Sequence, residues 1–305
     1  MSMLEFYTRP AMLDDFDTVL PLVQAHLAAD YQGENSLSAE DLQQIWEAFN
    51  LETDTSVVTD SSGRILGHGW FPSRERDNMT ILDPQFYVLP DLRGQGIEVL
   101  LLDAAEKRAM TNSGGMVVIQ PMVTNVTACQ ALEQAGYKFE LAFQKMVVEF
   151  DQPPSPGEFP TGLDIRAFVP GKDEQAAYQA DEEASLDKDY SHPVPFERWA
   201  ARMLNNPELC FLAWDGEEVA GGVFTQNYEG QGLVHHIGVR RPWRKRGLGA
   251  ALMQRTFFAC YVAGLRKIWL EVDTASPTGA TRLYERIGMR VVGVRSYFSK
   301  EITGS

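Results

Sequence analysis

Apolar and polar positions follow one another in the same order in the two halves of the chain. Each half opens with a short β-type segment and continues with two stretches in which apolar residues recur at helical spacing. These elements are expected over residues 5–9, 14–30 and 38–49 in the first half and over 163–168, 172–186 and 196–204 in the second. Ser38 begins the sequence Ser-Ala-Glu-Asp, which is typical of a helix N-terminus. The pattern predicts a strand and two helices at the start of each half.

A β-hairpin is expected next in each half. Residues 55–71 turn at Asp60-Ser-Ser-Gly63, and residues 210–224 turn at Asp215-Gly216, a pair that favours tight hairpins. Each hairpin is followed by an apolar strand, a loop that contains glycine, a long helix, a buried strand and a shorter helix. Strands that alternate with helices imply mixed, mostly antiparallel twisted sheets flanked by helices. The predicted fold class of both halves is α+β (α/β).

The two halves also share a numerical register. The equivalent pairs, each 151 residues apart, are Val88 and Val239, Arg93 and Arg244, and Gly96 and Gly247. A register kept through strand, loop and helix indicates a duplicated domain. The proline-rich segment 151–161 suits an extended linker. We therefore expect one domain over residues 1–150 and a second over residues 162–305.

The composition narrows the classes of partner. With 42 acidic and 27 basic residues, the formal net charge of −15 disfavours a nucleic-acid partner, because phosphate neutralisation requires a basic face. Cys129, Cys210 and Cys260 lack the spacing of a metal site or a disulfide framework. The chain shows no apolar run near the roughly 20 residues that span a bilayer and no signal peptide. We expect a soluble cytoplasmic protein that binds no metal, membrane or nucleic acid.

One loop departs from this acidic background. Five cations stand within seven residues: Arg240, Arg241, Arg244, Lys245 and Arg246. Gly247 and Gly249 follow them without side chains that would obstruct backbone N–H groups, at the start of a predicted helix whose N-terminus favours negative charge. The loop lacks the Gly-Lys-Ser/Thr of a Walker A site and the complete Rossmann fingerprint. It predicts a site for a ligand that carries a pyrophosphate.

The loop and a later segment resemble the two signatures of the GNAT acetyltransferase superfamily. Arg244, Gly247 and Gly249 match the motif Gln/Arg-x-x-Gly-x-Gly/Ala position for position, after a strand that ends at Val239. The segment from Asp273 to Met289 is similar to the family's second signature, with serine at 276 where asparagine is usual. The tandem layout is similar to that of the mycothiol synthases.

This resemblance implies a set of site residues and acetyl-CoA as co-substrate. Backbone amides of the loop would hold the pyrophosphate, and the strand backbone at Ile237 and Val239 would hold the pantetheine arm. The loop residues are Arg244, Lys245, Arg246, Gly247, Leu248, Gly249 and Ala250. Tyr284 would be the general acid, because a phenol with a pKa of about 10 can protonate a departing thiolate.

The acceptor amine must also lose a proton. His235, four residues before Val239, is the candidate base, with Glu271, Asp273 and bulk solvent as alternatives. His235 and His236 are expected to point to opposite faces of the strand. A second set of residues is expected either to line the acceptor pocket or to pack in the core: Tyr190, His192, Phe196 and Trp199.

The first half departs from both signatures. Glu98 stands where glycine or alanine is expected, so its carboxylate would repel a pyrophosphate. Leu132 stands in place of the tyrosine. We therefore expect a non-catalytic first domain and an N-acetyltransferase second domain. A CoA-binding module without catalysis and a longer-chain acyltransferase are the alternatives. The acceptor is expected to be a small-molecule or peptide amine, and the protein a monomer or homodimer.

Overall fold

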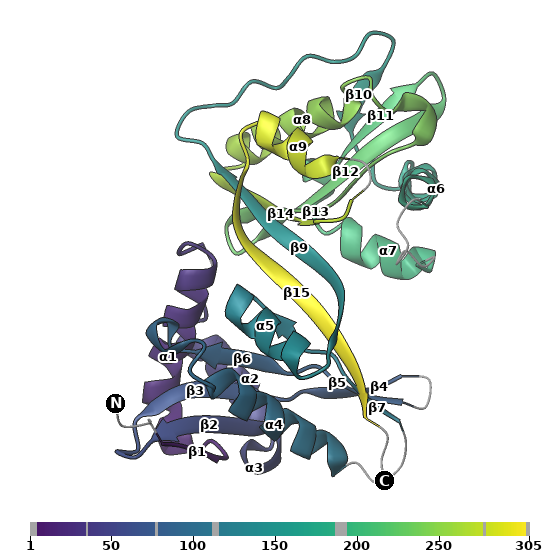
Figure 1. Ribbon diagram of the computed structural model, residues 1–305. Helices are drawn as coiled ribbons and strands as arrows, with labels where there is room; N and C mark the ends of the chain where they lie inside the picture. Colours follow the sequence, from purple (N-terminus) through teal and green to yellow (C-terminus); the bar gives the residue numbers. More distant parts are fainter. Residues whose placement is uncertain are drawn as a thin grey trace. The chain divides into compact units, whose positions relative to one another are not determined.

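The chain divides into two compact units in a computed structural model that describes residues 5–34, 36–76, 79–111, 116–186, 194–276 and 279–302 (Figure 1). The first unit comprises residues 1–144 together with 292–305, and the second comprises residues 145–291. The units differ from the halves expected from the sequence. Residues 292–302, which follow the second signature, belong to the first unit, and residues 145–149 belong to the second.

The helices and strands follow the predicted order in both units. In the first half they are β1 (Phe6–Arg9), α1 (Phe16–Asp30), α2 (Ala39–Ala48), α3 (Leu51–Asp54), β2 (Thr55–Asp60), β3 (Ile65–Trp70), β4 (Ser73–Arg76), β5 (Met79–Leu82), β6 (Gln85–Val88), α4 (Ile97–Met110), β7 (Val117–Ile119), β8 (Met122–Val123), α5 (Val126–Gln134) and β9 (Lys138–Glu149). Thereafter they are β10 (Asp164–Ala167), α6 (Glu174–Ser185), α7 (Phe196–Met203), β11 (Phe211–Asp215), β12 (Glu218–Tyr228), β13 (Gln231–Val239), α8 (Leu248–Val262), β14 (Lys267–Asp273), α9 (Ala280–Arg286) and β15 (Arg290–Ile302). The α+β class is thereby confirmed.

Alternate residues of the strands face two helical layers in the first unit. Its sheet runs in the order β1-β2-β3-β6-β8-β15. Val57 packs under α1 and α2, whereas its neighbour Val58 packs under α4 and α5. Both valines are fully buried. This period of two is what a strand with helices on both faces requires.

The second unit repeats the plan. Strands β10 to β13 pair antiparallel in sequence order, and β13 pairs parallel with β14. Leu212 packs with α6 and α7, and the adjacent Phe211 packs with α8 and α9. A matching salt bridge anchors the first helix of each unit. Arg9 contacts the carboxylate of Asp15 at 2.6 and 2.8 Å, and Arg166 contacts that of Asp173 at 2.6 and 2.9 Å.

Strand β15 completes the first unit. Its residues Lys300 and Ser296 pair with β7 and β8, and the Lys300 ammonium bonds Glu106 at 2.8 Å. Phe298 is 1% exposed in the core under α4 and α5. The strand therefore supplies both backbone pairing and core volume, which explains why the first unit includes it. The small β4-β5-β7 sheet, in which β4 and β5 pair antiparallel, was also absent from the sequence prediction.

Candidate functional site

Strands β13 and β14 separate at the end where the basic loop begins. They pair at Gly232 with Ile268 and at Leu233 with Trp269, and no later pair joins them in the described part of the chain. Toward Val239 and Asp273, the two strands therefore present backbone groups across a gap. Buried N–H and C=O groups need hydrogen-bond partners. An extended ligand with amide groups could supply them along Ile237 and Val239.

The loop after β13 presents free backbone donors at the start of α8. Gly247 has a φ of 84° and is the N-cap of this helix. The first intrahelical bond after it runs from the Ala251 amide to the Gly247 carbonyl at 3.1 Å. Amides of residues 246–250 therefore precede the helical ladder, and such donors form an anion site. Leu248 is 1% exposed and fixes the helix start in the core.

Gly249 sits where the helix approaches a neighbour closely. A Cβ atom at this position would lie 3.2 Å from Leu283 of α9. The half-buried Ala250 follows it on α8. A small residue at 249 therefore allows α9 to pack closely against α8. It also leaves the loop amides accessible to a ligand.

The basic side chains of this loop divide into two groups. Arg244 donates to the carbonyls of Val239 at 2.8 Å and Ala184 at 3.2 Å, so its guanidinium fastens the loop to β13 and α6. Arg240 pairs with Glu183 at 2.6 Å. Lys245 and Arg246 are exposed, and neither forms an ion pair with any residue that the structure describes. These two cations are the ones available to a bound anion.

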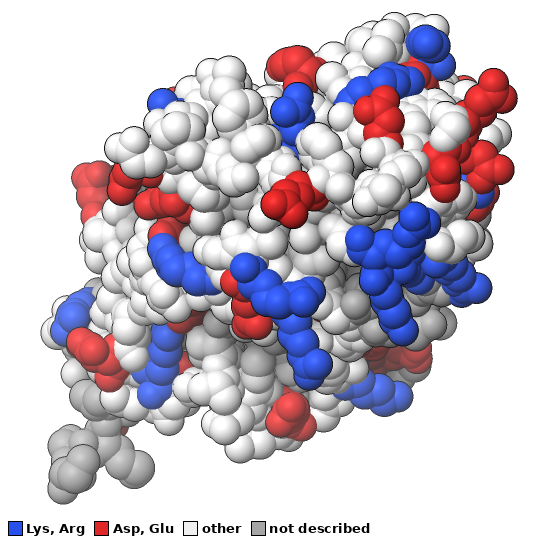
Figure 2. All heavy atoms as spheres, turned by 90° about the horizontal axis from the view of Figure 1, so that it is seen from above, with Lys and Arg blue, Asp and Glu red and all other residues white. Residues whose placement is uncertain are grey.

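Basic groups are local features of an acidic protein. On the face drawn in Figure 2, blue Lys and Arg side chains form separate groups between red acidic ones. In the described residues no helix is long and apolar enough to cross a membrane. Over the same residues, no cluster of three or more His, Cys, Asp or Glu side chains could hold a metal ion.

Tyr284 lies on α9 within the core cluster that contains α8 and β14, and 7% of the residue is exposed. Burial raises the pKa of its phenol, so the hydroxyl keeps its proton over the physiological range. Its hydroxyl forms no hydrogen bond with another residue that the structure describes. A neutral proton donor is therefore present next to the helix that begins at the loop.

The two histidines of β13 have different surroundings. Phe224 and Thr225 of β12 pair with His236 and Val234, so His235 is the extra residue of a β-bulge. It is half-buried, and burial and the nearby charge of Arg202 lower its pKa. The simple alternation expected for this strand is interrupted at this point.

His236 belongs to a chain of hydrogen bonds that the sequence reasoning missed. Its Nδ1 contacts Oδ1 of Asp181 on α6. The other oxygen, Oδ2, accepts the indole N–H of Trp199 at 2.8 Å. Asp181 is 7% exposed. The signal available in the sequence was an acidic residue on the apolar face of a helix, beside Ala177 and Ala180.

The other acceptor-side candidates have structural roles or lie outside the described residues. Trp199 is 2% exposed and packs with Phe196 in the core under α6 and α7. Asp273 accepts a hydrogen bond from the amide of Ala275 at 2.8 Å in the turn after β14, and the half-buried Glu271 lies within β14 itself. Tyr190 and His192 fall outside the described residues.

In the first unit, Glu98 occupies the corresponding loop. Its two carboxylate oxygens lie 3.1 and 3.3 Å from the backbone N–H of Gly94, which donates to them. Glu98 is 5% exposed. Gly96 is the N-cap of α4, with a φ of 96°, as Gly247 is for α8. The two loops thus share the same backbone geometry, but in the first unit the Glu98 carboxylate accepts a hydrogen bond from the amide of Gly94.

A histidine also meets the end of β6. The Val88 N–H donates to Nδ1 of His26 at 3.1 Å, and the His26 Nε2 lies 3.1 Å from Asp30. Arg93 bonds Asp30 at 2.7 Å and the His26 carbonyl at 3.4 Å. In the second unit the equivalent Arg244 donates to the backbone carbonyl of Ala184, so Ala184 occupies the position that His26 has in the first unit. Alanine has no side-chain nitrogen, so no side chain at this position accepts a hydrogen bond at the end of β13 as His26 does at the end of β6.

Comparisons with known proteins agree with the duplication. A family model described as Acetyltransferase (GNAT) family matches residues 20–137 and, separately, residues 174–289. A mycothiol acetyltransferase from Geodermatophilus obscurus is 26% identical over 285 residues, covering 88% of this chain and 89% of that protein. A GCN5-related N-acetyltransferase structure from Sphaerobacter thermophilus is 32% identical, with a TM-score of 0.75 over 98% of this chain and 97% of that one.

A tandem protein shares the fold at lower identity. A tandem GNAT protein from the clavulanic acid biosynthesis pathway matches 99% of this chain and 100% of its own, with a TM-score of 0.61 and 15% identity. That likeness extends over both units. The two-domain plan expected from the repeat is therefore found in a solved structure as well.

Proposed function

Because the chain belongs to the GNAT acetyltransferase family, we propose that its second unit transfers an acetyl group from acetyl-CoA to an amine. The observation that carries this proposal is the contrast between two equivalent loops. Loop 244–250 keeps its amides in front of the helical ladder, whereas Glu98 fills the loop of the first unit. The loop of the second unit can thus bind an external anion, whereas the equivalent loop of the first unit already binds the carboxylate of Glu98.

We expect acetyl-CoA to contact the second unit in two places. The amides of residues 246–250 would hold the pyrophosphate, with Lys245 and Arg246 adding charge. The pantetheine arm would enter the gap between β13 and β14, with its amide groups bonding the backbone near Ile237 and Val239. The thioester that it presents supplies an activated acetyl group for direct transfer.

Two proton transfers accompany this reaction. The amine nitrogen forms a bond to the acetyl carbon, and the bond between that carbon and sulfur breaks. Tyr284 donates its proton to the departing thiolate, because a neutral phenol beside the sulfur stabilises the charge that develops there. A base removes the surplus proton from the amine nitrogen, and the products are the amide and free CoA.

We assign the base to His236, with His235 as the alternative expected from the sequence. Asp181 accepts from the Nδ1–H of His236, which leaves Nε2 as the basic nitrogen. The Trp199 indole N–H donates to the second carboxylate oxygen of Asp181, which fixes the orientation of the Asp181–His236 pair. His235 is held in a bulge near the positive charge of Arg202, which makes it a weaker base.

Small-molecule amines are the first acceptors to test. Relatives with similar sequences over most of their length are named mycothiol acetyltransferases, and that name points to a small-molecule acceptor. Peptide N-termini form the second class. The acidic protein surface favours approach of a cationic amine.

An acetyl-CoA thiol-release screen over amine classes tests the proposal, with the Tyr284→Phe variant as the matched control. We expect turnover with at least one amine and a fall in kcat of about 100-fold in the variant, because a positioned general acid contributes a factor of this order. Binding of CoA without transfer to any acceptor would instead support a regulatory module. Faster turnover with longer acyl-CoA donors would support a longer-chain acyltransferase.

A further inference from the structure

The gap between β13 and β14 determines where an acceptor amine would meet the acetyl group. Within the described part of the chain, the two strands last pair at Leu233 with Trp269, which marks the closed end of the gap. The loop amides at the start of α8 lie at the open end, because β13 runs on to Val239 and directly into this loop. A pantetheine arm that starts from these amides would carry its thioester toward the closed end. The acceptor would therefore approach near Trp269.

Trp269 points away from the core cluster under α8. Its neighbours on β14, Ile268 and Leu270, are both buried in that cluster. Successive side chains of a strand point to opposite faces, so the indole lies on the other face of the sheet. That face also carries Leu233, because Val234 packs in the cluster under α8. Trp269 is half-buried, so the strand holds the ring while part of it stays accessible.

A second ring meets the indole at nearly a right angle. The ring centroids of Tyr228, at the end of β12, and Trp269 are 6.2 Å apart, and the ring planes form an angle of 78°. Tyr228 is 46% exposed. On the β9 side, the ammonium of Lys145 lies 4.6 Å from the centroid of the Trp269 ring. Both neighbours of the indole are side chains, which move to admit a ligand more readily than backbone does.

Polar groups around these two rings have no partner among the residues that the structure describes. Neither the Trp269 indole N–H nor the Tyr228 hydroxyl forms a hydrogen bond with another such residue. The same is true of the ring nitrogens of the half-buried His235 and of the guanidinium of the exposed Arg202. Arg202 comes from α7 and is close enough for its charge to lower the pKa of His235. A pair of rings with a few convergent polar groups is typical of a small-molecule site.

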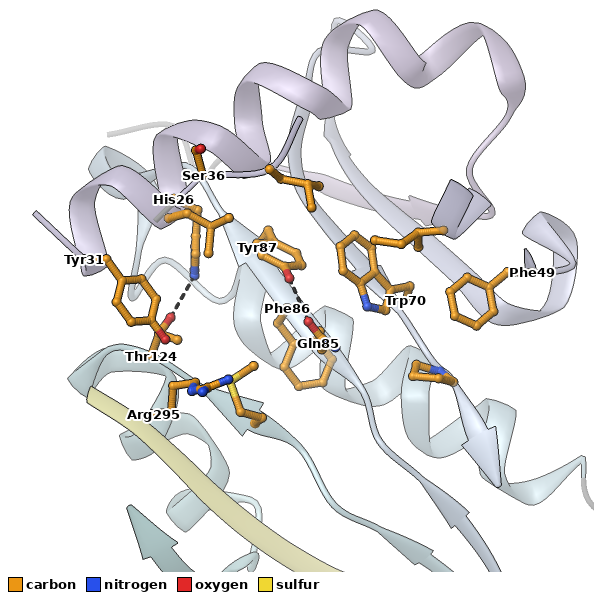
Figure 3. Close-up of a pocket in the computed structure, with 15 residues that line it drawn as sticks. His26, Tyr31, Ser36, Phe49, Trp70, Gln85, Phe86, Tyr87, Thr124 and Arg295 are labelled. Atoms are coloured by element: carbon orange, nitrogen blue, oxygen red, sulfur yellow. Dashed lines mark hydrogen bonds between the residues drawn. The ribbon is translucent and has the colours of Figure 1, made fainter. Parts of the chain in front are cut away.

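The first unit has a pocket on the corresponding side of its sheet (Figure 3). Its walls come from α1, α2, β3, β6, β8 and β15, and the rings of Trp70, Phe86 and Tyr87 form part of them. Figure 3 shows Gln85 of β6 bonded to the Tyr87 hydroxyl, at a distance of 2.8 Å. Gln85 stands 151 residues before His236. The duplicated fold therefore leaves space for a small molecule on this side of the strand that precedes the loop.

On the basis of the acetyl transfer proposed for the second unit, we propose that Trp269 and Tyr228 bind the body of the acceptor and select an amine that carries a ring. Aromatic rings prefer edge-to-face or offset contacts, and a corner of two rings offers both to a third ring. The amine of such an acceptor points toward the closed end of the gap. Trp269 is thus a residue that determines acceptor specificity.

Calorimetry on the full chain with CoA in excess tests the proposal without any transfer step. The probes are 2-phenylethylamine and ethylamine, which share the ammonium group and differ in the ring. We expect 2-phenylethylamine to bind at one site per chain and at least tenfold more tightly than ethylamine, because the ring packs on Trp269 and Tyr228. Equal affinity for the two amines would overturn the proposal, as would no binding of 2-phenylethylamine at millimolar concentration.

Variants place the ring on these residues. Trp269→Ala and Tyr228→Ala should each weaken binding of 2-phenylethylamine and leave that of ethylamine unchanged, whereas Trp269→Phe should retain part of the preference. Trp214→Ala is the matched control, because Trp214 is a half-buried indole of the same unit with the Arg166 guanidinium 4.6 Å from its ring centroid. It lies on β11, which β12 separates from β13. Circular dichroism melts check that each variant folds.

The outcomes separate this proposal from the acetyl transfer on which it rests. Transfer to amines with no preference for a ring, or a preference that both Trp269→Ala and Tyr228→Ala keep, would overturn the acceptor site alone. Tight binding of 2-phenylethylamine that is lost in Trp269→Ala, together with no transfer to any amine, would support the binding site and contradict the transfer.

Discussion

The carboxylate of Glu98 lies 3.1 and 3.3 Å from the amide nitrogen of Gly94, within the loop that precedes α4. Gly249 stands at the equivalent position, 151 residues later, and its loop contains no such carboxylate. A side-chain carboxylate and a phosphate use the same donors at a helix N-terminus. We therefore expect the residue at this one position to decide whether the loop amides bond a side chain of the protein or a bound ligand.

Transferring the carboxylate to the second unit should abolish its donor site. In Gly249→Glu, we expect affinity for CoA, measured by calorimetry, to fall at least a hundredfold from one site per chain. Two like charges about 4 Å apart repel by roughly 4 kcal/mol at an effective dielectric near 20. The Gly249→Ala variant adds size without charge, and its Cβ only approaches Leu283. We expect this variant to lower the affinity for CoA less than tenfold. Equal losses in the two variants would attribute the effect to size.

The two histidines of β13 should differ in their effect on catalysis. We expect His236→Ala to lower kcat/KM about 100-fold, since it removes the base held by Asp181, and His235→Ala to lower it only a few fold. Added imidazole should restore part of the rate to His236→Ala alone. If steady-state kinetics showed a larger loss of kcat/KM in His235→Ala than in His236→Ala, His235 would be the general base.

The buried carboxylate of Asp30 should make stability depend on pH. Burial alone would raise its pKa, but hydrogen bonds from His26 and Thr124 and the charge of Arg93 lower it to about 2 from 3.8. A depressed folded-state pKa stabilises the protein above the unfolded pKa, and this stabilisation is lost as the pH falls toward 2. The shift corresponds to about 2 kcal/mol.

Asp30→Asn should therefore lower the free energy of unfolding by about 2 kcal/mol at pH 7, measured by urea denaturation. The difference from the wild type should shrink as the pH falls from about 4 to about 2. The exposed Asp14→Asn serves as control and should have little effect at either pH. A difference that stayed constant with pH would show that packing, and not charge, explains the loss.

Strand β15 should stabilise the first unit although it follows the second in the sequence. Phe298→Ala should cost about 3 to 5 kcal/mol, because a fully buried ring is lost from the core under α4 and α5. Hydrogen exchange should then show lost protection in β7 and β8. Phe159→Ala, at a ring that is 45% exposed, is the matched control and should leave that protection unchanged.

Local signals in the sequence were sufficient for the repeat and for the strand-loop-helix unit that contains Arg244 and Gly249. They fix helix starts, such as the Ser38 cap, and turns, such as Asp215-Gly216. The bulge at His235 and the Asp181–His236 contact depend on how separate elements pack, which periodicity does not encode. The position of β15 was missed for the same reason, because pairing over a long sequence separation leaves no local pattern.

Membership of β15 in the first unit also has a consequence for how the protein is made. When the ribosome has finished residue 144, the first unit still lacks the strand that pairs with β7 and β8. The whole of the second unit must be synthesised before Phe298 can enter its core. During synthesis of the second unit, the first unit therefore has an unpaired strand edge. If translation stalled at this stage, that edge would be exposed to other proteins.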